Sequence, residues 1–262
     1  MNGGIFIQVL CFGQDPRFNV LINELRKKYS VDVSCDLNID VKKYDMIILP
    51  MKGVNEEFVE LLKGSKKSCV IYTGLIGSLK ELDREVISFL DDEYIREEND
   101  NITVDGIMDY IKDINYHNVC LLGYGHIGKK LYKKLDNVMV GVIEVGDKLE
   151  LGENSFYTND KDKMKDVFKN SDLIINTVPK NIIEYDMVKN LKCMILDIAS
   201  KPYGINQDIV KNSNLNYFLY SGIPSKYDPE RAGKILLKKF MWGEVWKLDF
   251  VLHHPFVHLI KF

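Results

Sequence analysis

The sequence has few cysteines, and their arrangement indicates neither a cross-link nor a metal site. The five cysteines are widely scattered, none forms a C-x-x-C pair, and their number is odd. This usage is typical of a protein from a reducing cytoplasm, and we predict no metal site. Four of them lie in or beside apolar runs and are expected to be packed core thiols. These are Cys11, Cys69, Cys120 and Cys193.

Long apolar runs and a strong excess of one charge are also missing. No run is long enough to span a bilayer, and we expect no signal peptide because a basic n-region and a small-residue cleavage site are absent. The net charge of −3 gives no reason to expect nucleic acid or an anionic membrane as a partner. A chain of 262 residues, 46% of them hydrophobic, can bury one large core or two modest ones.

Strand-like and helix-like segments alternate along the first hundred residues, which predicts a parallel α/β sheet. Asp15 is expected to cap the first helix, with Pro16 at its first position. The expected strands cover residues 5–10, 45–50 and 69–74, and the expected helices cover 15–28, the segment around 58–62, and 79–90.

A charge-rich stretch at 91–100 is interpreted as a linker, and 103–114 as a short helix that leads to a second α/β unit. Near the end of the chain, residues 228–239 are predicted to form a helix, with Asp228 as its N-cap and Pro229 at its first position. The aromatic and basic tail after it has no assigned role. The strands expected in the second unit cover 119–122, 138–143, 172–177, 193–198 and 216–220.

The segment from Val119 to Gly128 is the most informative, because an apolar strand leads into G-x-G-x-x-G and a helix-like stretch follows. In this context the pattern predicts a dinucleotide site on a doubly wound Rossmann sheet. Gly123 would allow a sharp turn, Gly125 would leave room for a pyrophosphate, and Gly128 would let the helix pack close to the sheet. The phosphates would lie at the helix N-terminus. The predicted cofactor-binding residues of this loop are Gly123, Tyr124, Gly125, His126, Ile127 and Gly128.

Ligands of such folds lie at the carboxyl ends of the strands, which draws attention to the later loops. Glu144 follows the second strand of this unit and could accept hydrogen bonds from the ribose hydroxyls, which would favour NAD over NADP; alternatively it is simply exposed, and Lys148 lies nearby. Lys201 could neutralise a substrate carboxylate or could be a surface lysine in a turn. The further predicted cofactor contacts are Asn176, Thr177, Val178, Pro179 and Ala199.

Short motifs follow one another in a fixed order from about residue 5 to residue 240. Besides the glycine motif they occupy residues 13–17, 47–50, 70–74, 103–106, 175–179, 196–202, 222–224 and 229–233. In order and spacing they resemble the family of dipicolinate synthase A subunits. The chain departs from the pattern of that family at Gln14, Lys201, Tyr203 and Ser225, which bears on activity and cofactor preference but not on the fold.

The resemblance implies an oxidoreductase of endospore formation, in the cytoplasm of the mother cell. It would oxidise a dihydropyridine dicarboxylate to aromatic dipicolinic acid with NAD or NADP, and work with a flavoprotein-like B subunit. The two substrate carboxylates require cations, for which Arg17, Lys201 and Arg231 are candidates. Thr103 and Ser200 could donate hydrogen bonds. The ring proton requires a base, and the candidates are Asp15, Asp105 and His126.

We therefore predict an α/β protein that joins a Rossmann sheet to a smaller, flavodoxin-like N-terminal α/β domain. The N-terminal domain, for substrate or partner, would comprise residues 1–100, and the helix at 228–247 is a candidate to return to it. The NAD(P)-binding domain would comprise residues 101–227, and residues 241–262 form the tail. A homo-oligomer is expected. One alternative is a D-2-hydroxyacid dehydrogenase, although the late histidines that such chemistry would need, His253, His254 and His258, fall in the tail. The other is a non-catalytic NAD(P)-sensing or scaffold subunit.

Overall fold

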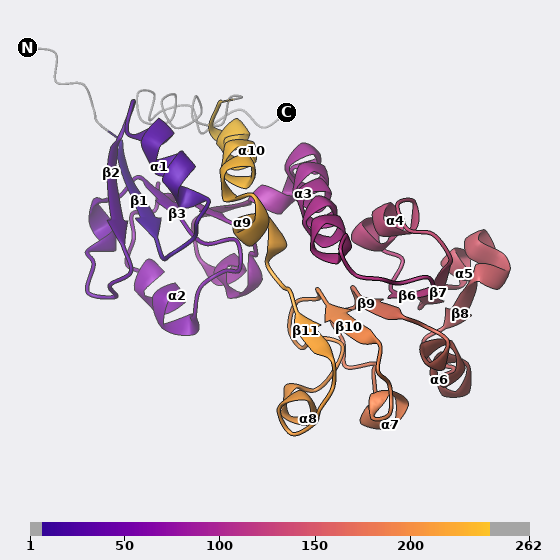
Figure 1. Ribbon diagram of the computed structural model, residues 1–262. Coiled ribbons are helices and arrows are strands. Elements are labelled where there is room, and N and C mark those ends of the chain that lie inside the picture. The colour runs from indigo at the N-terminus through magenta and orange to yellow at the C-terminus, as the bar shows by residue number, and fades with distance from the viewer. Residues whose placement is uncertain (1–6, 242–262) are drawn as a thin grey trace, which may run out of the picture. The chain divides into compact units, whose positions relative to one another are not determined.

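The structure is a computed structural model that describes residues 7–241, and it contains two α/β units (Figure 1). The chain builds the first unit up to Asn99, builds the second from Asp100 to Tyr227, and returns to the first from Asp228. Helix α3 (Glu93–Ile111) carries the chain from the first unit into the second. Within residues 7–241, no helix is both long enough and apolar enough to cross a bilayer.

The first unit is built on a five-stranded parallel sheet in the order β2-β1-β3-β4-β5. This is the flavodoxin-like order, in which the strand order reverses between β1 and β3. The central strands β3 and β4 are buried along their whole length, as expected for strands covered on both faces. The strands are β1 (Gln8–Phe12), β2 (Ser30–Ser34), β3 (Met46–Ile48), β4 (Val70–Thr73) and β5 (Glu85–Ser88).

Helices cover the first sheet. Helix α2 (Glu56–Leu62) buries Phe58 and Leu62 in a core that includes Leu10 and Ile47 of the sheet. Helices α1 (Phe18–Leu25) and α10 (Pro229–Met241) pack against each other. Their approach is close at Gly233, where a Cβ atom would lie 2.7 Å from the carbonyl oxygen of Arg17. Short 3₁₀ helices lie at Val41–Lys43, Gly77–Glu81 and Phe89–Asp91.

The second unit is built on a six-stranded parallel sheet in the order β11-β10-β9-β6-β7-β8. Counted from β6, this is the strand order of dinucleotide-binding Rossmann domains, with the reversal between β6 and β9. The predicted combination of a Rossmann sheet with a second α/β domain is thus confirmed. The strands are β6 (Val119–Leu122), β7 (Val138–Val142), β8 (Ser155–Tyr157), β9 (Leu173–Asn176), β10 (Met194–Asp197) and β11 (Tyr217–Leu219).

Helices lie on both faces of the second sheet (Figure 1). Alternate residues of its strands supply two cores, one on each face. Leu121 joins residues of α3 and α4, whereas Leu122 joins residues of α6 and α7. This alternation follows from the two-residue repeat of a strand. The remaining helices of this unit are α4 (His126–Tyr132), α5 (Val145–Leu151), η4 (Gly152–Asn154), α6 (Lys161–Lys169), α7 (Tyr185–Val188), α8 (Gln207–Lys211) and α9 (Ile223–Tyr227).

Two predicted segments are wrong. Residues 79–90 are not one helix, because 3₁₀ turns flank strand β5 there. Residues 91–100 are not a linker, because α3 begins at Glu93. The charged residues of that stretch indicated solvated loop, but Ile95 and Ile102 are fully buried, and this packing stabilises the helix.

The start of the first helix also differs from the prediction. Helix α1 begins at Phe18, and Arg17, not Asp15, takes its N-cap position. Asp15 nevertheless makes the bond expected of a cap, since its Oδ1 accepts from the Arg17 N–H at 3.1 Å, and the Arg17 side chain also binds its carboxylate. At the other end of the chain the predicted cap is confirmed, since α10 begins at Pro229 and the Arg231 N–H donates to Asp228 Oδ1 at 2.9 Å. The start of the strand expected at 5–10 and most of the tail at 241–262 lie outside the described residues.

Candidate functional site

The glycine loop follows β6 and leads into α4. Gly123 has a φ of +99°, in the left-handed region that favours glycine, and a Cβ there would lie 2.3 Å from Thr177 Oγ1. At Gly128 a Cβ would lie 2.2 Å from the carbonyl oxygen of Gly123. At Gly125 it would meet no atom within 4 Å. The outer two glycines are therefore required by the local packing, whereas the middle one leaves open space over the backbone.

The side chains of the loop differ in exposure. Tyr124 is buried, and its hydroxyl donates to Glu150 Oε1 at 3.0 Å. Burial, together with this carboxylate, raises the pKa of Tyr124 to about 12, so the hydroxyl stays protonated. His126 is exposed at the first position of α4, and Ile127 packs partly into the core below.

A second loop, residues 176–179, begins at the last residue of β9, the strand beside β6. Thr177 donates from Oγ1 to the carbonyl oxygen of Leu122 at 2.9 Å, which ties this loop to the end of β6. The Asn176 side chain is fully buried and bonds both the N–H and the carbonyl of Val178. It positions the loop. Pro179 is exposed to solvent and Thr177 is partly exposed.

Asp197 was not among the predicted site residues, yet it organises the third loop, which follows β10. Its buried carboxylate accepts hydrogen bonds from four donors on three segments of the chain. Burial and the nearby Asp197 charge raise the pKa of Tyr217, whose hydroxyl is one of these donors. An aspartate inside an apolar strand signals such a network, because a buried carboxylate is costly without partners. The donors are the Asn176 amide at 2.9 Å, Ala199 N–H at 3.1 Å, Gly204 N–H at 2.6 Å and the Tyr217 hydroxyl at 2.8 Å.

This network presents Ser200 and Lys201 to solvent, while Ala199 beside them is buried. The turn closes through a cis Lys201–Pro202 peptide bond and through Tyr203, whose φ of +69° lies in the left-handed region. Gly204 then packs on Asn176, because a Cβ at this position would lie 2.5 Å from the Asn176 amide nitrogen. Lys201 has no ion-pair partner among residues 7–241.

Glu144 follows β7 by two residues and is exposed at the N-cap position of α5, where its side chain makes no capping bond. Lys148, which the sequence placed nearby, donates to the carbonyl oxygens of Gly152 and Ser155 at 2.7 and 2.5 Å. Its ammonium is thus engaged in the turn before β8.

Arg17 and Asp15 form a bidentate ion pair in the first unit. Arg17 Nε donates to Asp15 Oδ1 at 2.7 Å and Nη2 donates to Oδ2 at 2.6 Å. The exposed fractions of the two side chains are only 10% and 5%. Burial by itself would raise the pKa of Asp15, but hydrogen bonds and charge from Arg17 outweigh it, and the pKa lies below its usual value. Arg17 is therefore not a free cation.

The other predicted substrate contacts lie elsewhere. Arg231 in α10 donates to Glu98 Oε2 at 3.3 Å, within the first unit. In the second unit, α3 carries the buried Thr103 and also Asp105, which pairs with Lys134 at 3.2 Å. The structure thus brings together the predicted loops of the second unit that follow β6, β9 and β10, whereas Arg17 and Arg231 are already paired with carboxylates.

The second unit fits a dinucleotide on two observations. Its strand order is the dinucleotide-binding one, and its glycine loop follows the strand at the point of reversal. The space over Gly125 is open, although a side chain would fill it at any other residue type. Among the described residues, no group of three or more histidine, cysteine or acidic side chains could hold a metal ion.

Comparison with known proteins agrees with this geometry. Residues 92–194 match the family model described as the NAD-binding domain of D-isomer specific 2-hydroxyacid dehydrogenases. The chain is 27% identical to the A subunit of dipicolinate synthase from Bacillus subtilis, in an alignment that covers 88% of both proteins.

Two solved structures share the fold. That of the A subunit of dipicolinate synthase from Bacillus halodurans has a TM-score of 0.71 at 22% identity, with 90% of this chain and 96% of that chain covered. The corresponding structure from Bacillus subtilis has a TM-score of 0.69 at 23% identity, with 94% and 97% covered. The predicted resemblance to the A subunit of dipicolinate synthase is confirmed. Together with the family match, it supports an oxidoreductase that carries an NAD(P)-binding domain.

Proposed function

We propose that this chain is an NAD(P)-dependent oxidoreductase that acts as the A subunit of dipicolinate synthase does, oxidising a dihydropyridine dicarboxylate to the aromatic dicarboxylate. The observation that carries the proposal is the open space over Gly125 on a Rossmann sheet, in a chain that resembles that subunit over most of its length. The reaction removes a hydride and a proton from the ring. Bound nicotinamide would supply the hydride acceptor.

The chain's own residues would bind the cofactor and orient the substrate. Gly125 would leave room for the pyrophosphate in the turn that Gly123 and Gly128 allow. Thr177 and Pro179 would lie along the cofactor, and Glu144 would face the ribose. Lys201 would receive a substrate carboxylate, since it has no ion-pair partner among the described residues, while Ser200 beside it would donate a hydrogen bond. Asp197 would hold this turn in place through its four hydrogen bonds.

The ring proton needs an acceptor among Asp15, Asp105 and His126. A low pKa makes Asp15 a weak base, and Asp105 is paired with Lys134. His126 is exposed within the glycine loop and is the remaining candidate. We further propose that the enzyme works with a flavoprotein-like second subunit, because the similar protein of Bacillus subtilis is named as one subunit of its synthase.

Turnover of a freshly generated dihydrodipicolinate, followed by the absorbance of reduced nicotinamide, tests the proposal. Lys201→Gln should lower kcat/KM about tenfold or more, mainly through KM, because it removes one charge-assisted contact. Lys192→Gln is the matched control, since Lys192 lies near the opposite end of the same strand.

The match to the 2-hydroxyacid dehydrogenase family favours a second candidate, oxidation of a 2-hydroxy acid. Turnover of such an acid, and none of dihydrodipicolinate, would replace the first proposal with this one. Tight NAD(P) binding without turnover, even with the second subunit present, would instead indicate a sensing or scaffold role.

A further inference from the structure

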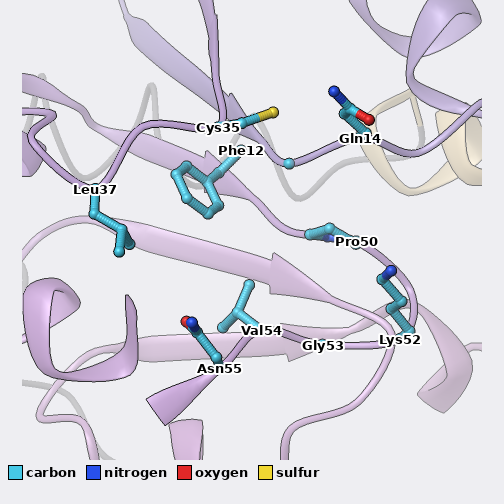
Figure 2. Close-up of a pocket in the computed structure, with 10 residues that line it drawn as sticks. Phe12, Gln14, Cys35, Leu37, Pro50, Lys52, Gly53, Val54 and Asn55 are labelled. Carbon is cyan, nitrogen blue, oxygen red and sulfur yellow. The ribbon is translucent and has the colours of Figure 1, made fainter. Parts of the chain in front are cut away.

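The two units present surfaces of different kinds. In the first, a hollow of about 400 Å³ opens beside Phe12 and Lys52 (Figure 2), and such a concave surface suits a small molecule. In the second, strand β11 lies at the end of the sheet, and β10 is its one neighbour among the described strands (Figure 1). A free sheet edge suits another strand, because its backbone groups have no partner on the outer side.

The ladder between β10 and β11 determines which backbone groups of β11 face outward. Tyr220 N–H donates to the carbonyl oxygen of Asp197 in β10 at 2.8 Å. Because alternate residues of a parallel strand bond to the same neighbour, Tyr217 and Leu219 direct their N–H and carbonyl groups away from β10. In the chain from residue 7 to residue 241, no other segment bonds to these outward groups. They are therefore available to a further strand.

The other edge strands of the two sheets are each protected by a charged group, which deters pairing with another chain. Strand β2 contains Asp32 and β5 contains Glu85. At β8 the Lys148 ammonium donates to the carbonyl oxygen of Ser155. Strand β11 has the sequence Tyr-Phe-Leu and carries no charge. Of the edge strands that the structure describes, β11 is thus the one left open to pairing.

The side chains around β11 form an exposed aromatic patch in the second unit. Phe218 and Leu219 of β11, Tyr110 of α3 and Tyr227 of α9 are each 38–43% exposed. The Tyr220 ring lies against that of Tyr110, with 5.0 Å between centroids. Aromatic side chains are enriched in the cores of protein interfaces, and a contiguous exposed patch of them indicates a protein partner.

Strand β11 is complementary to a second copy of itself. When two copies pair antiparallel about a two-fold axis at Phe218, Tyr217 of each copy lies opposite Leu219 of the other. The outward N–H and carbonyl groups of these two residues then bond to each other. Phe218 faces its equivalent in a non-hydrogen-bonded pair, where side chains approach most closely. The same register thus satisfies the backbone edge and buries the aromatic patch.

The charges around the patch do not oppose such a pairing. Lys226 lies over the Tyr220 ring, 5.9 Å from its centroid. Lys112 is paired with Asp109 at 2.9 Å, and Asp113 also acts on its charge. These two lysines and two aspartates balance, so two identical surfaces can meet without strong repulsion, and a strongly charged partner has no counterpart here.

The exposed area indicates a weak association. Four side chains that are each about two-fifths exposed, at roughly 200 Å² for a whole side chain, offer about 300 Å² on each copy. A stable interface buries about 800 Å² on each partner. Pairing through this edge should therefore be reversible and depend on concentration.

We propose that β11 pairs antiparallel with β11 of a second copy of this chain, joining the two six-stranded sheets into one. The Tyr217 hydroxyl of the same strand donates to Asp197, so pairing would also steady the network beneath the turn that carries Ser200 and Lys201. The proposal concerns the second unit and does not require the chain to be an oxidoreductase.

Sedimentation velocity of the full chain, from about 5 to about 300 µM, should show a mass that rises from monomer toward dimer. Phe218→Lys should raise the dissociation constant of the dimer about tenfold or more, because two ammonium groups would face each other across the axis. Leu219→Pro should do the same, since it removes an outward N–H that the ladder to β10 does not use. Leu149→Lys is the matched control, because Leu149 is an apolar residue of α5 with 80% exposure, and it should change nothing.

A disulfide tests the register directly. Facing residues of a non-hydrogen-bonded pair have Cα atoms about 4.5 Å apart, within the range of a disulfide. In a Cys35→Ser background, which removes the exposed native thiol, oxidation with diamide should link Phe218→Cys into a covalent dimer. Leu149→Cys in the same background should stay monomeric on a non-reducing gel.

A chain that is still monomeric at about 300 µM would overturn the proposal, even if the same edge bound a different protein. A dimer that both Phe218→Lys and Leu219→Pro leave intact would overturn it as well. If these two variants fail to fold, as judged by thermal melting, the Phe218→Cys cross-link decides, and no link beyond that of Leu149→Cys counts against the pairing. NAD(P) binding, measured on the same samples, reports on the oxidoreductase proposal separately.

Discussion

The side-chain amide of Asn176 donates a 2.9 Å hydrogen bond to the carboxylate of Asp197, and both side chains are fully buried. The bond joins the carboxyl ends of β9 and β10, where two of the loops proposed to face cofactor and substrate begin. Through this buried bond the two residues fix the loops relative to each other. The proposed function of this sheet edge would therefore depend on these two buried polar side chains as well as on the exposed ones.

Removing the Asp197 carboxylate should therefore destabilise the second unit strongly. Asp197→Ala leaves four donors, three of them buried, without this acceptor, and we expect a loss of about 3 kcal/mol in the free energy of unfolding. Asp160→Ala is the control, since Asp160 caps α6 through one exposed bond to Lys163 N–H, worth about 1 kcal/mol. Urea denaturation measures both variants. Equal losses would show that the network adds nothing beyond an ordinary cap.

Two alanine substitutions in the glycine loop should affect different properties, one the stability of the fold and the other the binding of the nucleotide. Gly128→Ala places a Cβ 2.2 Å from a backbone oxygen, so the fold must shift, at a cost of about 1–3 kcal/mol or more. Gly125→Ala places a Cβ in open space and should leave the melting temperature nearly unchanged. It should nevertheless weaken NAD(P) binding severely, because the methyl group occupies the place proposed for the pyrophosphate.

Calorimetry with NAD and NADP, beside thermal melts of both variants, checks this contrast. If Gly125→Ala bound the nucleotide as the unaltered protein does, the proposed position of the pyrophosphate would be wrong.

Glu144 should set the preference between the two nucleotides. A carboxylate that accepts from ribose hydroxyls repels a 2′-phosphate, so the unaltered chain should bind NAD more tightly than NADP. Glu144→Gln removes the charge and should shift the NADP/NAD affinity ratio about tenfold toward NADP. Glu153→Gln, at an exposed position in η4, should leave the ratio unchanged. An unaltered ratio in Glu144→Gln would remove Glu144 from the site.

The buried central strands could be predicted from the sequence, and so could the edge strand β11, within the expected segment 216–220, but the edge strands β2, β5 and β8 could not. Strands β3 and β6 are continuous apolar runs, and β9 is apolar up to its last residue, Asn176, because both faces of these strands are covered. Strands β2 and β5 are half-buried and alternate with polar residues. Segments of this kind carry a weak hydrophobic signal, which is why the sequence predicts a helix in place of β5.

The candidate site, too, could be predicted from the sequence only in part. The glycine motif has a spacing that directly encodes its backbone geometry, so the residues from Gly123 to Gly128 could be predicted. Pairing between side chains is not encoded by spacing. The sequence therefore offers Arg17 and Arg231 as free cations for a substrate, but each is bound to a carboxylate, Asp15 and Glu98 respectively. The role of Asp197 could not be predicted, because its hydrogen-bond partners lie on separate segments of the chain.

The Arg17–Asp15 pair should make the free energy of unfolding depend on pH in the acidic range. The pKa of Asp15 is below its usual value in the folded protein, so the unfolded chain binds more protons. The contribution of the pair is therefore complete above about pH 4, the ordinary pKa of an aspartate, and is lost as the pH falls through the folded pKa. Asp15→Asn removes this contribution at neutral pH, where it leaves a buried guanidinium half-paired.

We expect Asp15→Asn to be clearly less stable than the unaltered protein at pH 7, and the difference to shrink as the pH falls toward about 3. Urea unfolding of both proteins across this range measures it. Asp83→Asn serves as the comparison, because Asp83 pairs with Lys67 on the open surface, where ion pairs add little. Parallel stability curves for Asp15→Asn and the unaltered protein would mean that Arg17 does not hold the Asp15 carboxylate in its charged form.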